Sequence, residues 1–276
     1  DHIYYSKDHF NAKSDQGTVS EMFTNYSTIV SSTTANLNHT FGEKHNVTFL
    51  AGFEAEKNKT DFMRSTGTNL PVSSLQVVQT AGTSEANAYY WGNSIVSILS
   101  RAEYNYDNKY YFSASYRRDG SSKLGPDSRW GNFWSVAGSW RINDEEFMKD
   151  IDWISNLRLR ASYGVNGTLP SSNNGWRSLA SYSYQYGGEP GGALANAADA
   201  NLSWETSYTS NFALEFGFLD DRIKGSVEYF NRDSKDLLQD VPISYITGFS
   251  STLKNVGEIN NKGIEFELSG DIIANK

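Results

Sequence analysis

The chain has no cysteine, which limits the folds and the chemistry open to its 276 residues. Without cysteine there is no disulfide framework and no thiolate ligand for a metal. The chain also lacks an excess of positive charge, because 32 Asp and Glu residues outnumber 24 Lys and Arg residues and give a formal net charge of −8. No basic patch with interleaved aromatic residues stands out, and neutralising phosphates requires one. We therefore expect no nucleic acid among its partners.

Long apolar runs are missing too. A helix needs about 20 predominantly apolar residues to cross a bilayer. The longest clear apolar run here, Ile95–Leu99, is interrupted by Ser97. If this chain lies in a membrane, it must do so as a closed barrel, because only closure satisfies the backbone groups at strand edges. The negative mean hydropathy agrees with that reading, since the lumen and the loops of a barrel are polar.

Signatures of enzymatic or metal chemistry are sparse. The sequence has no GxSxG elbow, P-loop or dinucleotide-binding fingerprint. Asn231–Asp236 resembles a calcium loop only faintly, because the required glycine and distal glutamate are missing. An outer-membrane hydrolase would need a Ser/His/acid cluster assembled from distant strands. We expect no enzyme, no cofactor and no metal. The four histidines lack metal-ligand spacing: His2, His9, His39 and His45.

Aromatic residues, by contrast, are abundant at 14%, although only 38% of residues are hydrophobic. This balance favours strands over helices and suits rings placed at membrane–water boundaries. Several rings flank short polar segments: Tyr104, Tyr106, Tyr110, Tyr111, Trp140, Trp153, Phe216 and Phe218. A barrel has such a girdle at each interface. A soluble β-sandwich with a tyrosine-rich surface remains an alternative.

Apolar and polar residues alternate along several segments with the period of a strand. In 211–218, Phe212, Leu214, Phe216 and Phe218 alternate with small or polar residues. Segments 47–54, 157–165 and 264–269 repeat the pattern. The polar positions include arginines, glutamates and glycines, which suit a crowded, wet barrel lumen. The candidates to line that lumen are Arg158, Arg160, Glu215, Glu228, Glu265 and Glu267.

Short turns and long loops alternate along the chain. The predicted short turns are Gly42–Asn46, Asp107–Lys109, Asn143–Ser155, Asp220–Asp221 and Asn260–Gly263. The predicted long connections are 58–93, 119–131, 167–203 and 235–253. This alternation predicts an all-β fold, an antiparallel up-and-down transmembrane β-barrel wall of about 10–12 strands belonging to a larger barrel. Its short turns lie on one side and its long loops on the other.

Little else is expected to be regular. Asn143–Met148 could form a short helical turn with Asn143 or Asp144 as N-cap. Gly187–Gly192 is expected to be irregular because it is rich in glycine.

Aromatic residues in the predicted loops are candidates to contact substrate. Flat rings stack on the C–H faces of sugars while polar neighbours bond the hydroxyls. The alternative is that these rings pack the loops together or meet a partner protein. The candidates are Tyr89, Tyr90, Trp91, Trp176, Tyr182, Tyr184 and Tyr186.

Four blocks in order resemble the SusC/RagA family of TonB-linked outer-membrane transporters. The longest is Tyr110–Gly125, with the sequence YYFSASYRRDGSSKLG, and it continues through Arg129–Phe133. The others are Leu157–Gly164, Leu202–Thr206 and Asn255–Glu265. Trp134 stands where the family usually has proline, and Ser139 replaces a glycine. These departures concern one strand only.

The resemblance implies a plugged outer-membrane barrel of about 22 strands that imports glycan or peptide oligomers. It also implies two protein partners, a SusD-like surface lipoprotein lid and the TonB–ExbB–ExbD complex, with outer-membrane lipid around the wall. We expect residues 1–276 to be a partial barrel domain, with the plug domain and the closing strands outside this sequence. Two alternatives remain: a siderophore- or cobalamin-type receptor, and a soluble β-rich adhesin or carbohydrate-binding module.

Overall fold

The structure, a computed structural model, describes residues 1–271 and consists mainly of antiparallel strands. The strands are β1 (His2–Tyr5), β2 (Thr18–Phe41), β3 (His45–Thr68), β4 (Thr83–Tyr106), β5 (Tyr110–Ser121), β6 (Trp130–Arg141), β7 (Ile154–Thr168), β8 (Ala180–Tyr186), β9 (Glu189–Leu194), β10 (Glu205–Phe218), β11 (Ile223–Lys235), β12 (Leu238–Pro242), β13 (Ser251–Asn255) and β14 (Glu258–Gly270). Four 3₁₀ helices of three residues each are η1 (Val78–Thr80), η2 (Ile142–Asp144), η3 (Glu146–Met148) and η4 (Tyr245–Thr247). Within residues 1–271, no helix has the length and apolar character needed to cross a bilayer.

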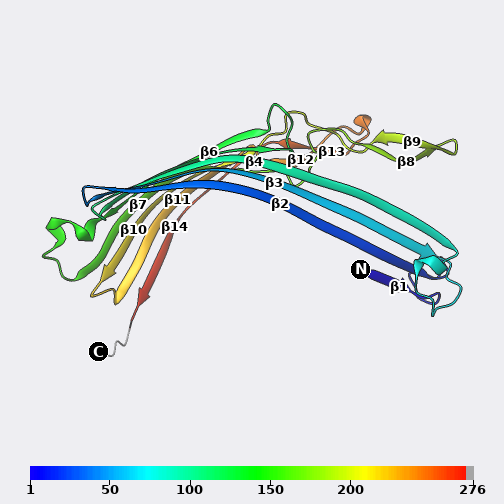
Figure 1. The fold of residues 1–276 in the computed structure, drawn as a ribbon, viewed down its shortest axis with the longest axis horizontal. Helices are drawn as coiled ribbons and strands as arrows, with labels where there is room; N and C mark the ends of the chain where they lie inside the picture. The colour runs from blue at the N-terminus through cyan, green and yellow to red at the C-terminus, as the bar shows by residue number, and fades with distance from the viewer. Residues whose placement is uncertain (272–276) are drawn as a thin grey trace. The chain divides into compact units, whose positions relative to one another are not determined.

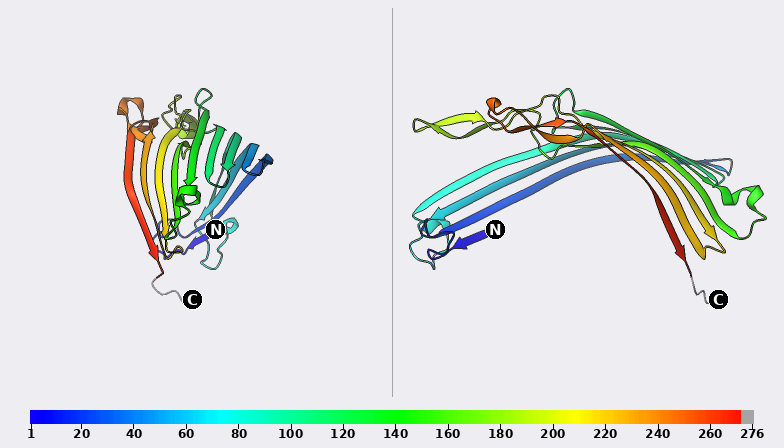
Figure 2. Two further views of the ribbon diagram at one scale, coloured as in Figure 1. Left: turned by 90° about the vertical axis from the view of Figure 1, so that its left-hand side faces the viewer. Right: turned by 180° about the vertical axis from the view of Figure 1, so that it is seen from behind.

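Ten strands form one sheet in the order β1-β2-β3-β4-β5-β6-β7-β10-β11-β14 (Figure 1). Consecutive strands of this sheet are neighbours, and two small hairpins, β8–β9 and β12–β13, lie within its long connections. Figure 2 shows β5, β6, β7, β10, β11 and β14 side by side. This is the predicted up-and-down wall.

The chain divides into two compact units. The first contains Asp1–Val30 and Glu56–Ser94, and the second contains Ser31–Ala55 and Ile95–Lys276. In the first unit, β1 pairs antiparallel with the start of β2. Ala12, Val19 and Leu70 are fully buried there. They are the fully buried apolar side chains among the described residues of this unit.

In the second unit, the turns between strands have the backbone geometry that tight hairpins require. Asp107 and Asn108 join β4 to β5 with φ values of 53° and 56°. Leu219, Asp220 and Asp221 join β10 to β11, also with positive φ. Asparagine and aspartate tolerate this region better than most residues, which explains why polar pairs stand there. The predicted turns at these two places are confirmed.

The buried core of the second unit lies among its long connections. Leu124, Phe133, Leu202 and Trp204 form it, with the ring centroids of Phe133 and Trp204 5.1 Å apart. The partly buried side chains packed against it are Leu169, Trp176, Leu238 and Leu253. We call these eight residues the loop core. It packs the connections 122–129, 169–204 and 236–257 against one another.

The predicted turn at Asn260–Gly263 is wrong, because these residues lie inside β14. Gly263 pairs with Phe230 of β11, and a Cβ there would stand 2.9 Å from the Phe230 ring. The glycine therefore makes room for a cross-strand ring. The connection actually ends at Val256–Gly257, where Gly257 has a φ of 81°.

Three other expectations are corrected by the strand and cap positions. The predicted loop 58–93 is only 69–82, because β3 and β4 extend into it. Gly187–Gly192 is partly regular, since β9 begins at Glu189. The predicted helical turn exists as η2 and η3, but neither has a side-chain cap, and the cap positions are Arg141 and Glu145.

Candidate functional site

The register separates the sheet of the second unit into two faces. Residues directly opposite in antiparallel strands share a face. Leu214 lies opposite Leu159 on one side and Val227 on the other, and Val227 lies opposite Phe266. We call this the apolar face. Ala213 lies opposite Arg160 and Glu228, and we call that the polar face.

The apolar face is open rather than covered by a second sheet. Phe212 is 55% exposed, and Leu214, Ile264 and Phe266 are exposed as well. A β-sandwich module would bury these side chains in its core. The soluble-module alternative is therefore overturned, and the face has the character of a lipid-facing barrel wall.

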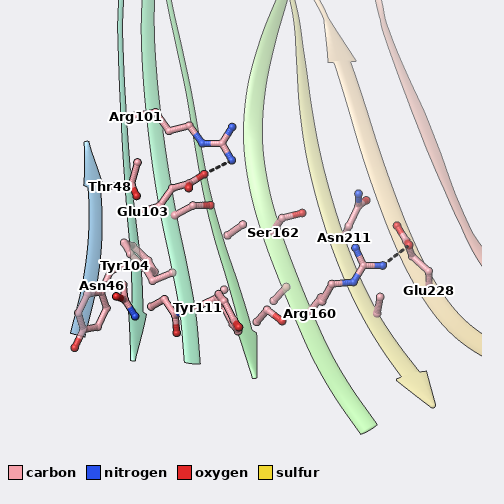
Figure 3. A pocket seen from close by; sticks show the side chains of 18 residues that line it. Asn46, Thr48, Arg101, Glu103, Tyr104, Tyr111, Arg160, Ser162, Asn211 and Glu228 are labelled. Atoms are coloured by element: carbon pink, nitrogen blue, oxygen red, sulfur yellow. Dashed lines mark ion pairs between the residues drawn. The ribbon is translucent and has the colours of Figure 1, made fainter. Parts of the chain in front are cut away.

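A cavity of about 470 Å³ opens on the polar face of the second unit (Figure 3). Charged pairs lie on two sides of it: Arg101 with Glu103, and Arg160 with Glu228. Between these two charged pairs, hydroxyl and amide side chains line the cavity. They are Thr48, Ser113, Ser139, Ser162, Asn46 and Asn211. The cavity can therefore hydrogen-bond a polar solute or a polar protein segment.

Four of the six predicted lumen-lining residues form one ion-pair network. Arg160 Nε lies 2.7 Å from Glu215 Oε1, and Arg160 Nη2 lies 3.9 Å from Glu228 Oε2. Arg158 Nη1 lies 3.7 Å from Glu215 Oε2. Glu265 lies directly opposite Glu228 on the next strand, so the polar face becomes acidic towards β14. Glu267 follows Glu265 two residues later on the same face.

A second polar-face cluster was not predicted from the sequence. Arg117 Nε donates to Asp119 at 2.7 Å, and its Nη2 lies 2.8 Å from Ser97 Oγ and 3.2 Å from Glu54 Oε1. Arg117 and Asp119 stand two apart in the Arg-Arg-Asp-Gly segment, so period-2 alternation places both on one face. That spacing could have identified the pair. Glu54 and Ser97 come from other strands and gave no such signal.

Three of the predicted substrate-contact residues lie on a strand instead of in a loop. Tyr89, Tyr90 and Trp91 belong to β4 in the first unit. The rings of Tyr89 and Trp91 stack with centroids 5.4 Å apart. Tyr90 points to the opposite strand face, where Lys59 Nζ lies 5.6 Å from its ring. The three rings therefore do not form one surface.

The other four aromatic candidates divide into two groups. Trp176 belongs to the loop core, and the Arg177 guanidinium lies 5.4 Å from its ring. It thus holds loops together. Tyr182, Tyr184 and Tyr186 lie on β8 of the β8–β9 hairpin, and Tyr186 is 89% exposed. The rings of these three tyrosines are exposed to solvent.

On the turn side, Glu145 joins three side chains next to η3. Its carboxylate accepts hydrogen bonds from the Tyr110 hydroxyl and from Trp140 Nε1, and Lys109 Nζ lies 3.5 Å away. The Tyr110 hydrogen bond is the main cause that lowers the pKa of Glu145 below its ordinary value. The rings of Tyr110 and Trp140 stack 6.3 Å apart, so aromatic residues do gather beside this turn.

The histidines have structural partners. His2 lies 2.8 Å from Glu21, and His45 Nδ1 lies 2.7 Å from the Tyr104 hydroxyl. His9 and His39 pack against Tyr5 and Phe41. Among residues 1–271, no group of three or more His, Asp or Glu side chains could hold a metal ion.

The second unit is thus an antiparallel sheet with one apolar face and one charged face. Residues 2–274 match the family described as TonB dependent receptor-like, beta-barrel. The chain belongs to this family. TonB-dependent receptors of the SusC and RagA kind are outer-membrane proteins, and they are transporters and receptors rather than enzymes. The predicted family, fold and location are confirmed.

Individual relatives support the SusC/RagA branch of these TonB-dependent receptors. The chain is 33% identical over 254 residues to the TonB-dependent receptor P39 of Formosa agariphila, covering 87% of this chain and 24% of that protein. It is 35% identical over 200 residues to the TonB-dependent receptor SusC of Bacteroides thetaiotaomicron, covering 70% of this chain and 20% of SusC. The chain therefore spans about a quarter or less of the length of these relatives.

A solved structure of the RagAB peptide transporter superposes on this chain with a TM-score of 0.88 and 29% identity. The match covers 94% of this chain and 29% of that one. This chain therefore shares the fold of the matched part of that structure, and the sequence likeness accompanies it.

Proposed function

We propose that this chain is part of the barrel wall of an outer-membrane importer for glycan or peptide oligomers. The observation that carries the proposal is the pairing of an exposed apolar face with a charged polar face on one sheet, Phe212 against Glu215 being an example. Such a sheet separates lipid from a watery interior. The likeness to SusC and to the RagAB peptide transporter supports import of oligomers in particular.

The partners follow from the same likeness. We propose that a SusD-like lipoprotein covers the loop side and that the TonB–ExbB–ExbD complex supplies energy through a plug. The likeness to SusC and to the RagAB peptide transporter supports the first partner. The family name supports the second.

Within this proposal the site residues have distinct roles. Arg158, Arg160, Glu215 and Glu228 line the interior and hold one another by ion pairs, and Glu265 and Glu267 extend this lining along β14. Tyr89, Trp91 and the β8 tyrosines are proposed to contact substrate, because their rings are exposed. Trp176 is proposed to stabilise the loops instead.

Deletion of the full-length gene tests the importer. The expected result is loss of growth on one polymeric glycan or on peptides as sole carbon source, with normal growth on the monomers. A protonophore, which removes the energy that TonB transmits, should stop uptake in wild-type cells. Loss of growth only under iron or cobalamin limitation would replace the proposal with a siderophore- or cobalamin-type receptor.

A further inference from the structure

The first unit contains a cluster of three aromatic rings on β3 and β4. Phe62 of β3 and Tyr89 of β4 lie with ring centroids 4.7 Å apart, and Tyr89 stacks on Trp91 at 5.4 Å. The planes of successive rings differ by only 34° and 26°. Tyr89 is 50% exposed and Trp91 37% exposed. The three rings therefore form one aromatic cluster that is partly open to solvent.

A hydrogen-bonded set of polar side chains continues the same strand face. Asn58 Nδ2 donates to Glu56 and lies 3.3 Å from Asn93 Oδ1. Thr28 of β2 donates to Asn58 Oδ1 at 2.7 Å. Phe62, Asn58 and Glu56 are separated by even numbers of residues on β3, as are Tyr89, Trp91 and Asn93 on β4. Rings and polar groups thus share one face of β2, β3 and β4, which are neighbours in the sheet.

The backbone beneath this face is closely packed. A Cβ at Gly92, between Trp91 and Asn93, would overlap the carbonyl oxygen of Asn58. The backbones of β3 and β4 leave no room for a side chain at position 92. A ligand would therefore contact the side chains of this strand face and not the backbone between the strands. We call the seven residues Thr28, Glu56, Asn58, Phe62, Tyr89, Trp91 and Asn93 the aromatic platform.

These groups match the two kinds of surface that a sugar ring offers. The C–H faces of a pyranose stack on flat aromatic rings. Its hydroxyls can donate hydrogen bonds to the carboxylate of Glu56 and to the amide oxygen of Asn58, which keep lone pairs beyond the bonds they already accept. Because hydrogen bonds already hold these side chains in place, little conformational entropy is lost when a ligand binds.

We propose that the aromatic platform is a binding site for a neutral oligosaccharide. The proposal rests on the proposed importer and gives its substrate class at this surface as glycan. Strand length agrees with a site in water. β2, β3 and β4 have 24 residues each, whereas about 9–11 suffice to cross a membrane. The polar stretch Lys57–Asp61, charged on the face opposite Asn58, also suits water on both sides.

The test is binding by calorimetry, with the full-length receptor and three probes. The probes are α-1,4- and β-1,4-linked gluco-oligosaccharides and β-1,4-linked xylo-oligosaccharides, each of about six units, long enough to span the strands. The double variant Tyr89→Ala/Trp91→Ala should weaken binding of the preferred probe by about tenfold or more, since two stacked rings are lost. Asn58→Ala should weaken it several-fold.

The matched control is Tyr90→Ala, which removes an equally large exposed ring from the opposite face of the same strand. It should leave affinity unchanged. The proposal is overturned if no probe binds the wild-type receptor, or if the control loses as much affinity as the double variant. Binding of hexapeptides with the same sensitivity to Tyr89→Ala/Trp91→Ala would also overturn it.

Uptake in cells separates this site from the importer as a whole. If protonophore-sensitive uptake of oligomers persists unaltered in the double variant, the platform is wrong and the importer stands. If the wild-type receptor supports no such uptake, the importer itself fails.

Discussion

Glu145 shows how one carboxylate orders the turn side of the sheet. Because its pKa is lowered, its contribution to stability is present above the ordinary value of 4.5 and is lost as the pH falls through the lower, folded-state value. The acid-sensitive contacts are those with Tyr110, Trp140 and Lys109. Protonation should therefore loosen the connection 142–153 first.

Substituting Glu145→Ala should speed hydrogen exchange in 142–153 several-fold at neutral pH, because the Tyr110 hydroxyl and the Trp140 indole lose their common acceptor. Mass spectrometry of the full-length receptor measures this. Glu146→Ala is the control, since Glu146 is exposed and its ion pair is with the exposed Lys149, three residues later. Wild type and Glu145→Ala should converge at acidic pH. Equal effects of both variants at neutral pH would contradict the role given to Glu145.

Single residues also explain where prediction from the sequence stops. Alternation placed Arg158, Arg160, Glu215 and Glu228 on one face, and the structure joins them by ion pairs. The pairing of Glu54 with Arg117 depends on strands 63 residues apart, which no local pattern reports. The prediction that Tyr90 contacts substrate together with Tyr89 and Trp91 depends on a loop at this place, whereas all three lie on β4. On a strand, adjacent residues must face opposite ways.

At the scale of elements, the misplaced boundaries have a common cause. Hydrophobic alternation marks a strand only where its two faces meet different surroundings. The far half of β3, Glu56–Thr68, is mostly polar, with Phe62 and Met63 as its large apolar residues, so alternation does not mark it and the predicted loop begins at 58, inside the strand. Asn260–Gly263 has the composition of a turn but pairs with β11. Where the two faces do differ, as in β10, the alternation predicts the strand end at Phe218 but only the part from 211 of a strand that begins at Glu205.

Phe133 links an element of the wall to the loop core. A Cβ at Gly167 would overlap the Phe133 ring, which lies between β7 and Trp204. Gly167→Ala should therefore displace the ring and cost about 1–3 kcal/mol of local stability through overpacking. Limited proteolysis of the full-length receptor should then cut within 169–204 sooner. Gly138→Ala is the control, because a Cβ there meets only a backbone oxygen at 3.8 Å.

The pair can be tested against itself. Adding Phe133→Leu to Gly167→Ala replaces the ring with a smaller side chain, which leaves room for the new Cβ. The double variant should therefore recover part of the protease resistance. If the double variant is cut as fast as the sum of the single effects predicts, the contact between Phe133 and Gly167 does not control the loops.

For the whole molecule, the assignment of the two faces to lipid and water is the claim with the widest consequence. Phe212→Arg places a charge on the apolar face and should cost about 2–4 kcal/mol of folding free energy in a bilayer if it lies near the midplane. Asn211→Arg places the same charge one residue away, in the polar cavity beside Glu228, and should cost far less. Folding of the full-length receptor into lipid vesicles, followed by its heat-modifiable mobility on gels, compares the two. An equal loss for both variants would mean that the faces do not separate lipid from water, and the importer would lose its physical basis.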